Sequence, residues 1–193
     1  MTAVGRASAT RATLLTAARE VFTASGFAEA SIADVVSRAG ASVGSLYHHF
    51  GGKADLYLAL YEDYSVRQEE RAVDAVQVAR AAGESDPVRL FVAGARAYLD
   101  GCWVERDLAR LFLAGGGPPG FGLAARRRYR EWTRRNATLL RTGDDGEPWG
   151  DALVLVLTTV VSEAGHEVAV CEEEGAARSL AADVLVLIAR IGS

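Results

Sequence analysis

The sequence predicts an all-α protein of about nine helices, with a three-helix N-terminal domain over residues 8–68 and a helical domain over residues 69–193. Three observations support this fold class. Half of the 193 residues are hydrophobic and four are proline, which suits a helical globule. Apolar residues recur three and four positions apart along most of the chain, as on one face of a helix. Residues 31–50 contain two short helical patterns joined by a tight turn, which predicts a helix-turn-helix.

The helix-turn-helix is marked by residues that begin and end helices. Ser31 can cap the first helix, with Asp34 three residues later as the second member of a capping box. Gly40 follows this helix and supplies a residue that tolerates positive φ at the helix end. Ser42 can then cap the second helix. These spacings predict where both helices begin and where the first one ends.

The second helix of the motif begins with the small residues Val43, Gly44 and Ser45. Such a helix can enter the major groove of double-stranded DNA, because no bulky side chain holds its backbone away from the bases. Val43 can contact a thymine methyl group, and Ser45 can hydrogen-bond to a base edge. These contacts are individually weak, so we expect DNA shape to supply much of the sequence specificity.

Polar residues at the end of this helix suit the DNA backbone. The phenol of Tyr47 and the imidazoles of His48 and His49 can donate to phosphate oxygens, contacts that position a protein without reading sequence. Packing of His49 under the following helix is an equally good interpretation. Lys53 begins that helix, where a cation is unfavourable unless an anion is near, and this favours a phosphate contact.

These features form one pattern with the sequence before them. It comprises a hydroxyl residue opening the first helix, an Ala-Gly turn, the run Gly-Ser-Leu-Tyr-His-His-Phe at residues 44–50, and a glycine linker before Lys53. Residues 14–26, followed by Phe27, complete it upstream. Over residues 8–68 the sequence resembles the DNA-binding domain of the tetracycline-repressor (TetR) family. It differs from the common family pattern at Ala33, Val36 and Val43.

The resemblance implies roles for individual residues. Ser31, Tyr47, Lys53 and one or both histidines would form a phosphate clamp. Val43 and Ser45 would occupy the base-reading positions. The predicted DNA-binding residues are therefore Ser31, Ser42, Val43, Gly44, Ser45, Tyr47, His48, His49 and Lys53.

The distribution of charge agrees with a nucleic-acid partner. The whole chain has a formal net charge of −4, yet residues 1–53 carry +2 and the remaining residues carry −6. A locally positive N-terminal domain attracts phosphates, and an acidic body limits non-specific binding.

Beyond the motif the chain keeps a helical pattern that breaks at a few points. Turn-forming residues occur at residues 83–86, 114–120 and 143–146, and Pro87 suits the first position of a helix. On the long helix that follows the motif, we expect the polar stretch Arg67–Arg71 to face solvent. The expected helices span residues 53–82, 87–103, 105–113, 121–141, 149–170 and 176–191.

The last two helices carry apolar residues on more than one side. A helix that is apolar all round must be covered all round. One side can face the protein's own core and the other a second copy of the chain, so we expect a homodimer through residues 149–191. A fully buried central helix is the alternative. The family resemblance also implies a dimer, formed by a four-helix bundle of these two helices.

Large side chains gather on the middle helices. The family resemblance implies an effector pocket between them, and bulky walls with few polar groups favour an apolar or aromatic ligand. Ordinary core packing is the alternative for each residue. The candidate effector-binding residues are Tyr98, Cys102, Trp103, Phe112, Phe121 and Trp132.

Six arginines between Arg126 and Arg135 form a dense basic run. A second nucleic-acid surface or a site for an acidic effector would use such a run. Because the arginines occupy all sides of the expected helix, a mainly solvated face is the favoured interpretation.

The sequence carries no recognisable catalytic or metal-binding pattern. Cys102 and Cys171 are too few for a disulfide framework and lack metal-ligand spacing, and no Gly-x-Ser-x-Gly motif accompanies them. We therefore expect no enzyme activity, cofactor or metal ion. The N-terminus has no apolar stretch of secretory type. The longest apolar run, residues 153–161, is shorter than the roughly 20 residues that span a bilayer, so we expect a cytoplasmic protein without a membrane partner.

Taken together, the residues predict a ligand-responsive transcriptional regulator, in particular a repressor. It would bind a palindromic double-stranded DNA operator as a homodimer and be released by a small, largely apolar or aromatic effector. Two alternatives stay open. One is a DNA-binding dimer without an effector, whose middle-helix aromatics would be packed solid, and the other is an enzyme on a helical scaffold.

Overall fold

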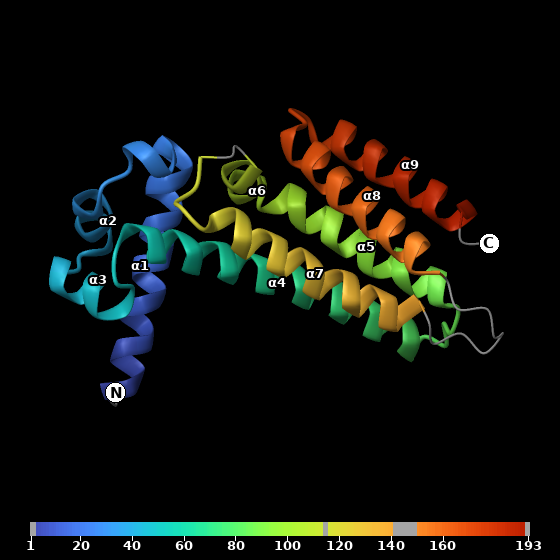
Figure 1. Ribbon diagram of the computed structural model, residues 1–193, viewed down its shortest axis with the longest axis horizontal. Helices are drawn as coiled ribbons and strands as arrows, with labels where there is room; N and C mark the ends of the chain where they lie inside the picture. The colour runs from blue at the N-terminus through green and yellow to red at the C-terminus, as the bar shows by residue number, and fades with distance from the viewer. Residues whose placement is uncertain (1–2, 114–115, 141–149, 192–193) are drawn as a thin grey trace. The chain divides into compact units, whose positions relative to one another are not determined.

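In the computed structural model, which describes residues 3–113, 116–140 and 150–191, the chain is all-α, as the sequence predicts. Nine helices occur within these residues (Figure 1). They are α1 (Ala3–Glu29), α2 (Ile32–Ala39), α3 (Val43–His49), α4 (Lys53–Ala81), α5 (Pro87–Val104), α6 (Arg106–Leu113), α7 (Phe121–Leu140), α8 (Asp151–Val170) and α9 (Glu174–Ile191).

The structure confirms the predicted first residues of two helices, Lys53 and Pro87. α4 begins at Lys53. α5 begins at Pro87, and the Asp86 carboxylate before it accepts the backbone N–H of Arg89 at 2.7 Å, which caps the helix. Several predicted features lie outside the described residues, namely residues 114–115, Arg141, residues 143–146 and Trp149.

The chain forms two compact units. The first comprises residues up to Tyr64 together with Leu111–Ala124, and the second comprises Ser65–Arg110 together with the residues from Ala125 onward. The first part of α4 therefore belongs to one unit and the remainder to the other. The division into domains at residues 68 and 69 stays a prediction.

The core of the first unit is rich in aromatic contacts. The buried ring of Phe22 on α1 lies 5.3 Å from that of Tyr57 on α4, and Tyr57 lies 5.5 Å from Phe112 and 5.4 Å from Phe121. Each edge-to-face pair contributes about 0.5–1.5 kcal/mol beyond its buried area. Burial raises the pKa of Tyr57 to about 12, and its hydroxyl donates to the carbonyl oxygen of Leu111 at 3.4 Å. These contacts bind the end of α6 and the start of α7 to the first part of α4.

In the second unit, α5, α8 and α9 lie side by side and form the core (Figure 1). Each contributes buried aliphatic residues, including Leu99, Leu157 and Ile188. Fully burying a side chain of this size contributes about 1.5–3 kcal/mol. Trp132 and Leu139 of α7 pack against the same cluster. The unit is therefore a helical layer with α7 laid against it.

α8 is the one helix, among the described residues, that is long and apolar enough to cross a membrane by length and composition. The sequence argument that residues 153–161 are too short is thus corrected, because the helix has 20 residues. Its buried face packs within the core of the second unit and includes Val154, Leu157 and Val161. Its other face carries Leu155, Val156 and Val160, which are exposed. One apolar face of α8 is therefore covered inside the unit and one is not.

Candidate nucleic-acid interface and ligand cavity

The helix-turn-helix has the capping geometry that the sequence predicts. The Ser31 hydroxyl accepts the backbone N–H of Asp34 at 3.1 Å and donates to the Asp34 carboxylate at 2.6 Å. Gly40 ends α2 with φ 59° and ψ 30°, in the left-handed region that favours glycine. The Ser42 hydroxyl accepts the backbone N–H of Ser45 at 3.1 Å, which caps α3. An N-cap contributes about 1 kcal/mol, so local contacts largely determine this motif.

The accessible side of α3 is built from small residues in its first turn. Val43 and Gly44 are exposed, and Ser45 is half-buried. Leu46 and Phe50 are buried on the opposite side. The first turn carries no side chain larger than valine, so its backbone can approach another molecule closely.

The residues at the end of α3 differ in accessibility. Tyr47 and His48 are exposed, whereas His49 is half-buried. The two imidazole rings lie 5.2 Å apart in an edge-to-face arrangement, and the His49 ring lies 6.2 Å from that of Phe50. Arg11 of α1 lies 5.2 Å from the same phenylalanine ring. Sequence reasoning missed this arginine, because only the folded unit brings α1 beside the end of α3.

Lys53 has a role in the fold that its sequence position does not reveal. Its ammonium group donates to the carbonyl oxygens of Ala28 at 3.0 Å and Ala30 at 2.8 Å. It also lies 4.6 Å from the ring centroid of Phe27. An ammonium group has three donors, so two are used within the unit and one remains for an anion. Lys53 therefore holds the end of α1, and its phosphate contact stays a prediction.

The six candidate effector residues do not form one cluster. Phe112 and Phe121 belong to the aromatic core of the first unit. In the second unit, Tyr98 is buried against Trp132, with ring centroids 4.3 Å apart. Cys102 is buried in the core beside them, and Trp103 is half-buried under Arg106.

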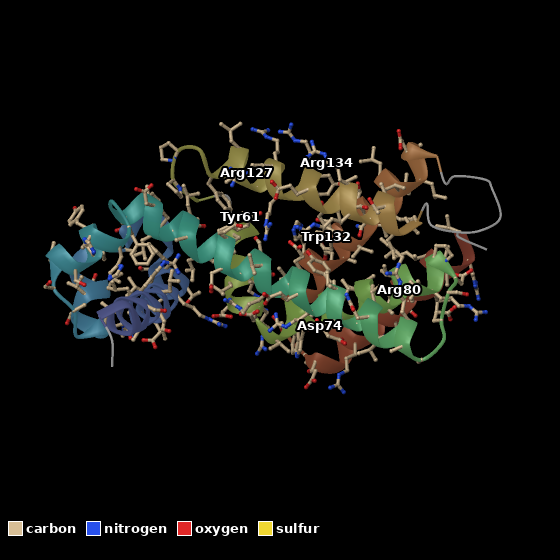
Figure 2. The ribbon with its side chains drawn as sticks, turned by 90° about the horizontal axis from the view of Figure 1, so that it is seen from below. Tyr61, Asp74, Arg80, Arg127, Trp132 and Arg134 are labelled. Carbon is tan, nitrogen blue, oxygen red and sulfur yellow. The ribbon has the colours of Figure 1, made fainter. Side chains whose placement is uncertain are left out.

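The second unit contains a cavity of about 210 Å³ among α4, α5, α7 and α8. Most of its wall is apolar and includes Val76, Phe91, Trp132 and Val161. Of the candidate effector residues, Trp132 lines this cavity. Figure 2 labels Trp132 on α7 and Arg80, another lining residue, near the end of α4. The polar residues of the wall are Glu69, Gln77, Arg80, Arg135 and Asn136.

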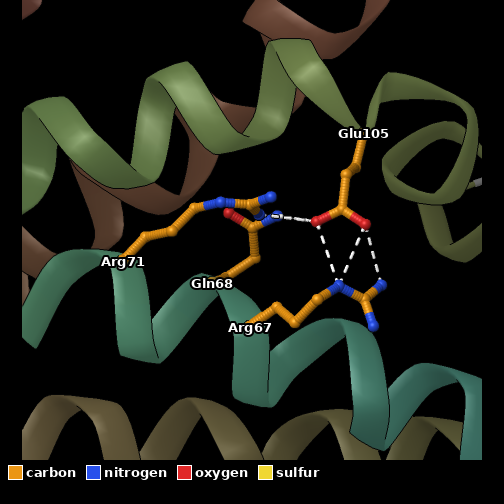
Figure 3. Close-up of polar contacts among 4 residues, drawn as sticks. All are labelled: Arg67, Gln68, Arg71 and Glu105. Carbon is orange, nitrogen blue, oxygen red and sulfur yellow. Dashed lines mark hydrogen bonds and ion pairs between the residues drawn. The ribbon is translucent and has the colours of Figure 1, made fainter.

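A buried carboxylate joins α4 to the end of α5 in the second unit (Figure 3). The Glu105 side chain is 6% exposed and lies 2.8 Å from the Arg67 guanidinium and 2.5 Å from that of Arg71. Gln68 also donates to it, at 3.2 Å. Burial alone would raise the pKa of Glu105, but the hydrogen bonds and charges of the two arginines outweigh burial and lower the pKa below 4.5. The prediction that Arg67–Arg71 faces solvent is therefore wrong, because this stretch supplies the partners of a buried acid.

The arginine-rich helix α7 has two kinds of arginine. Arg128 is largely buried, and its guanidinium lies 3.4 Å from the carboxylates of both Glu69 and Glu131. Arg135 also pairs with Glu69. Arg126, Arg127, Arg130 and Arg134 are exposed, and so is Arg135. The solvated-face interpretation therefore fits the first four, while Arg128 and Arg135 connect α7 to α4.

No group of three or more histidine, cysteine or acidic side chains that could hold a metal ion occurs in the part of the chain that the structure describes. Three features of the described residues remain as candidates for function: the exposed first turn of α3, the cavity and the Glu105 cluster.

Comparisons with known proteins agree with the helix-turn-helix. Residues 14–60 match the family described as bacterial regulatory proteins, tetR family. The HTH-type transcriptional activator FasR of Mycolicibacterium smegmatis is 40% identical over 97 residues, which cover 50% of this chain and 41% of that protein. The match thus spans less than half of the relative's length.

Solved structures extend the likeness over almost the whole chain. A TetR-family transcriptional regulator from Pectobacterium atrosepticum is 27% identical, with a TM-score of 0.64 over 99% of this chain and 95% of that one. The fatty acid degradation regulator FadR from Bacillus halodurans is 13% identical, with a TM-score of 0.72 over 92% and 96% of the two chains, and shows the shared fold alone. The capped helix-turn-helix and these matches show that the chain carries the helix-turn-helix domain of the TetR family of bacterial regulatory proteins.

Proposed function

We propose that the protein is a transcriptional regulator that places α3 in the major groove of double-stranded DNA. The observation that carries this proposal is the doubly capped helix-turn-helix, whose α3 begins with an accessible turn of small residues. In this arrangement Val43 and Ser45 contact base edges, and Gly44 permits the close approach. The hydroxyl of Ser42 is used in the cap, so this residue acts by orienting α3.

The DNA backbone is held by the residues around α3. Tyr47 and His48 are exposed and can donate to phosphate oxygens, and His49 contributes through the accessible part of its ring. Lys53 offers its third ammonium hydrogen. The Ser31 hydroxyl is used within the α2 cap, so the backbone N–H groups of the first turn of α2 are the more accessible donors there.

Titration of the promoter beside the protein's own gene, read by gel shift at several salt concentrations, tests this proposal. Ser45→Ala should change base preference more than general affinity, and Tyr47→Phe should weaken binding to every sequence about equally. Ser37→Ala provides a matched control, because Ser37 is exposed on α2 and outside the proposed contacts. Absence of any shift down to the lowest salt would exclude DNA binding.

We also propose that the regulator is a homodimer, with a second copy covering the exposed apolar faces of α8 and α9. Val156 and Val160 on α8, and Val186 and Leu187 on α9, are exposed within one copy. An interface of this kind repeats each contact by symmetry. The two helix-turn-helix motifs of a dimer, one from each copy, match the two halves of a palindromic operator.

A single charge placed in this face tests the dimer. Val156→Asp should give monomers in sedimentation velocity and abolish operator binding, because an unpaired buried charge costs several kcal/mol twice over. Val78→Asp is the matched control, since Val78 is also an exposed valine but lies on α4. A dimeric, operator-binding Val156→Asp protein would place the interface elsewhere.

The cavity of the second unit supports an effector-responsive regulator. We propose that a small, largely apolar or aromatic effector binds there and releases a cytoplasmic repressor from its operator. A promoter–reporter strain, with and without the gene, tests the direction of regulation: lower reporter output without the gene would identify an activator instead.

A further inference from the structure

We infer that the cavity of the second unit selects a small carboxylic acid with a ring-sized apolar body and a second polar group that donates a hydrogen bond. This inference rests on the proposed function, because it names the chemical class of the proposed effector. It follows from three parts of the wall: a buried amide, a set of apolar side chains and an arginine.

The amide of Asn136 supplies the first part. Asn136 is 9% exposed and lines the cavity. Its Nδ2 donates to the hydroxyl of buried Thr158 at 3.0 Å, whereas its Oδ1 accepts no hydrogen bond from the residues that the structure describes. Because Asn136 lines the cavity, this oxygen is open to an acceptor role toward a ligand. A hydroxyl or N–H group of a ligand in the cavity can donate to it in place of water.

The apolar part of the cavity wall fits a ring. Val76, Phe91 and Val161 present aliphatic and aromatic surface, and Trp132 adds an indole. An apolar cavity of about 150 Å³ accommodates benzene, so about 210 Å³ accommodates a ring with a short substituent. Aromatic walls favour an aromatic body through stacked or edge-to-face contacts.

The charged residues of the wall favour an anionic ligand. Glu69, the one acidic residue among the described residues that line the cavity, is paired with Arg128 and Arg135 of α7. Arg80 lines the cavity without an acidic partner among the described residues. Its place in the last turn of α4 already favours a cation, and a guanidinium can bind a carboxylate through two parallel hydrogen bonds. The net preference of this wall is therefore for an anionic group at Arg80.

Three probes separate these contributions. The protein, without DNA, is titrated by calorimetry with three compounds. The first, 3-(4-hydroxyphenyl)propanoate, carries both polar groups. The second, 3-phenylpropanoate, lacks the hydrogen-bond donor, and the third, 4-ethylphenol, lacks the carboxylate. Loss of the donor should weaken binding about threefold to tenfold. Loss of the carboxylate should weaken it about two- to fivefold, since Arg80 is exposed to solvent.

Variants assign each preference to its residue. Arg80→Gln should remove the preference for the carboxylate and keep that for the hydroxyl, and Asn136→Leu should do the reverse. Arg134→Gln, an exposed arginine on α7 outside the cavity wall, should change neither. If Asn136→Leu does not fold, the pair of ligands with and without the hydroxyl still decides the role of the amide on the unchanged protein.

Equal affinity for all three probes, or no binding at millimolar concentrations, would overturn the inference, as would identical behaviour of Arg80→Gln and Arg134→Gln. Because calorimetry needs no operator, its result is independent of DNA binding. Selective binding that leaves operator affinity unchanged would contradict the effector role in the proposed function, whereas operator binding without probe binding would contradict only the ligand class.

Discussion

Replacing Glu105 with glutamine tests the cluster that joins α4 to the end of α5. Glutamine keeps the shape of the side chain but removes its charge and one acceptor oxygen. Arg67 and Arg71, which lie 2.8 Å and 2.5 Å from the carboxylate, would then face a neutral amide. We expect a marked loss of stability.

The size of the loss follows from burial. Breaking a buried ion pair from one side costs about 3–5 kcal/mol, because the remaining charge is left uncompensated. The side chains of Arg67 and Arg71 are 33% and 34% exposed, so water can partly solvate them after the change. We therefore expect Glu105→Gln to lower the free energy of unfolding by about 2–3 kcal/mol.

Glu174→Gln is the matched control. Glu174 lies 2.6 Å from Arg178, a geometry as good as that of the buried cluster, but the two side chains are 53% and 75% exposed. Exposed pairs on a helix contribute about 0.3–0.5 kcal/mol. The same substitution should therefore cost several times less here, and equal losses at the two sites would show that burial does not set the strength of the cluster.

Urea unfolding followed by circular dichroism, at one fixed protein concentration, measures both losses. The pH dependence supplies a second check. The pKa of Glu105 is lowered from 4.5 in the folded protein, so its contribution is fully present above 4.5 and is lost as pH falls through the lowered folded value. The difference between the original protein and Glu105→Gln should shrink on acidification below that range; a difference that grows there would refute the reasoning.

Three further predictions concern other contacts. Gly101→Ala should lower the free energy of unfolding by about 1–3 kcal/mol in thermal denaturation, because the added Cβ would collide with Gln68 Oε1. Gly175→Ala on α9 is the control: the added Cβ meets open space there, so this change should be neutral or stabilising. Ser31→Ala should cost about 1 kcal/mol through loss of the α2 cap, read from the urea midpoint. Lys53→Ala should weaken binding to all DNA sequences and reduce the slope of log affinity against log salt by about one unit. An unchanged slope would exclude the phosphate contact and show that Lys53 acts through its structural contacts, such as those with the carbonyl oxygens of Ala28 and Ala30.

The parts of the fold that the sequence predicts well depend on neighbours along the chain. The caps at Ser31 and Ser42 join residues three apart, and the turn at Gly40 depends on one backbone conformation. Capping residues and left-handed glycines have strong preferences of their own. The helix-turn-helix could therefore be placed almost residue by residue.

Contacts between distant segments were not predictable in this way. Arg67 and Arg71 on α4 have the same charge pattern as a solvated helix face, and their partner Glu105 lies more than thirty positions later. Lys53 meets the carbonyls of Ala28 and Ala30 only after α1 and α4 come together. In each case the partner is chosen by packing, which local patterns do not record.

The candidate ligand site shows a different reason for an incomplete prediction. The candidate residues are mostly large and aromatic, but side chains such as Tyr98 and Cys102 fill space and belong to the core. A cavity remains where side chains are small, and Ala72, Gly94 and Ala95 indeed line it. Small residues that face one another on neighbouring helices are therefore the sequence signal that indicates such a cavity.

One turn of α4 serves both the cavity and the buried cluster, and the geometry of a helix explains how. Successive residues point about 100° apart around the axis. Gln68 therefore reaches Glu105 at the end of α5, while Glu69, the next residue, lines the cavity and pairs with Arg128 and Arg135 of α7. Each carboxylate has its own arginines, so the two sites share a backbone without sharing a charge. Arg67 and Arg71 thus pair with Glu105, Arg128 and Arg135 pair with Glu69, and Arg80 lines the cavity outside both clusters.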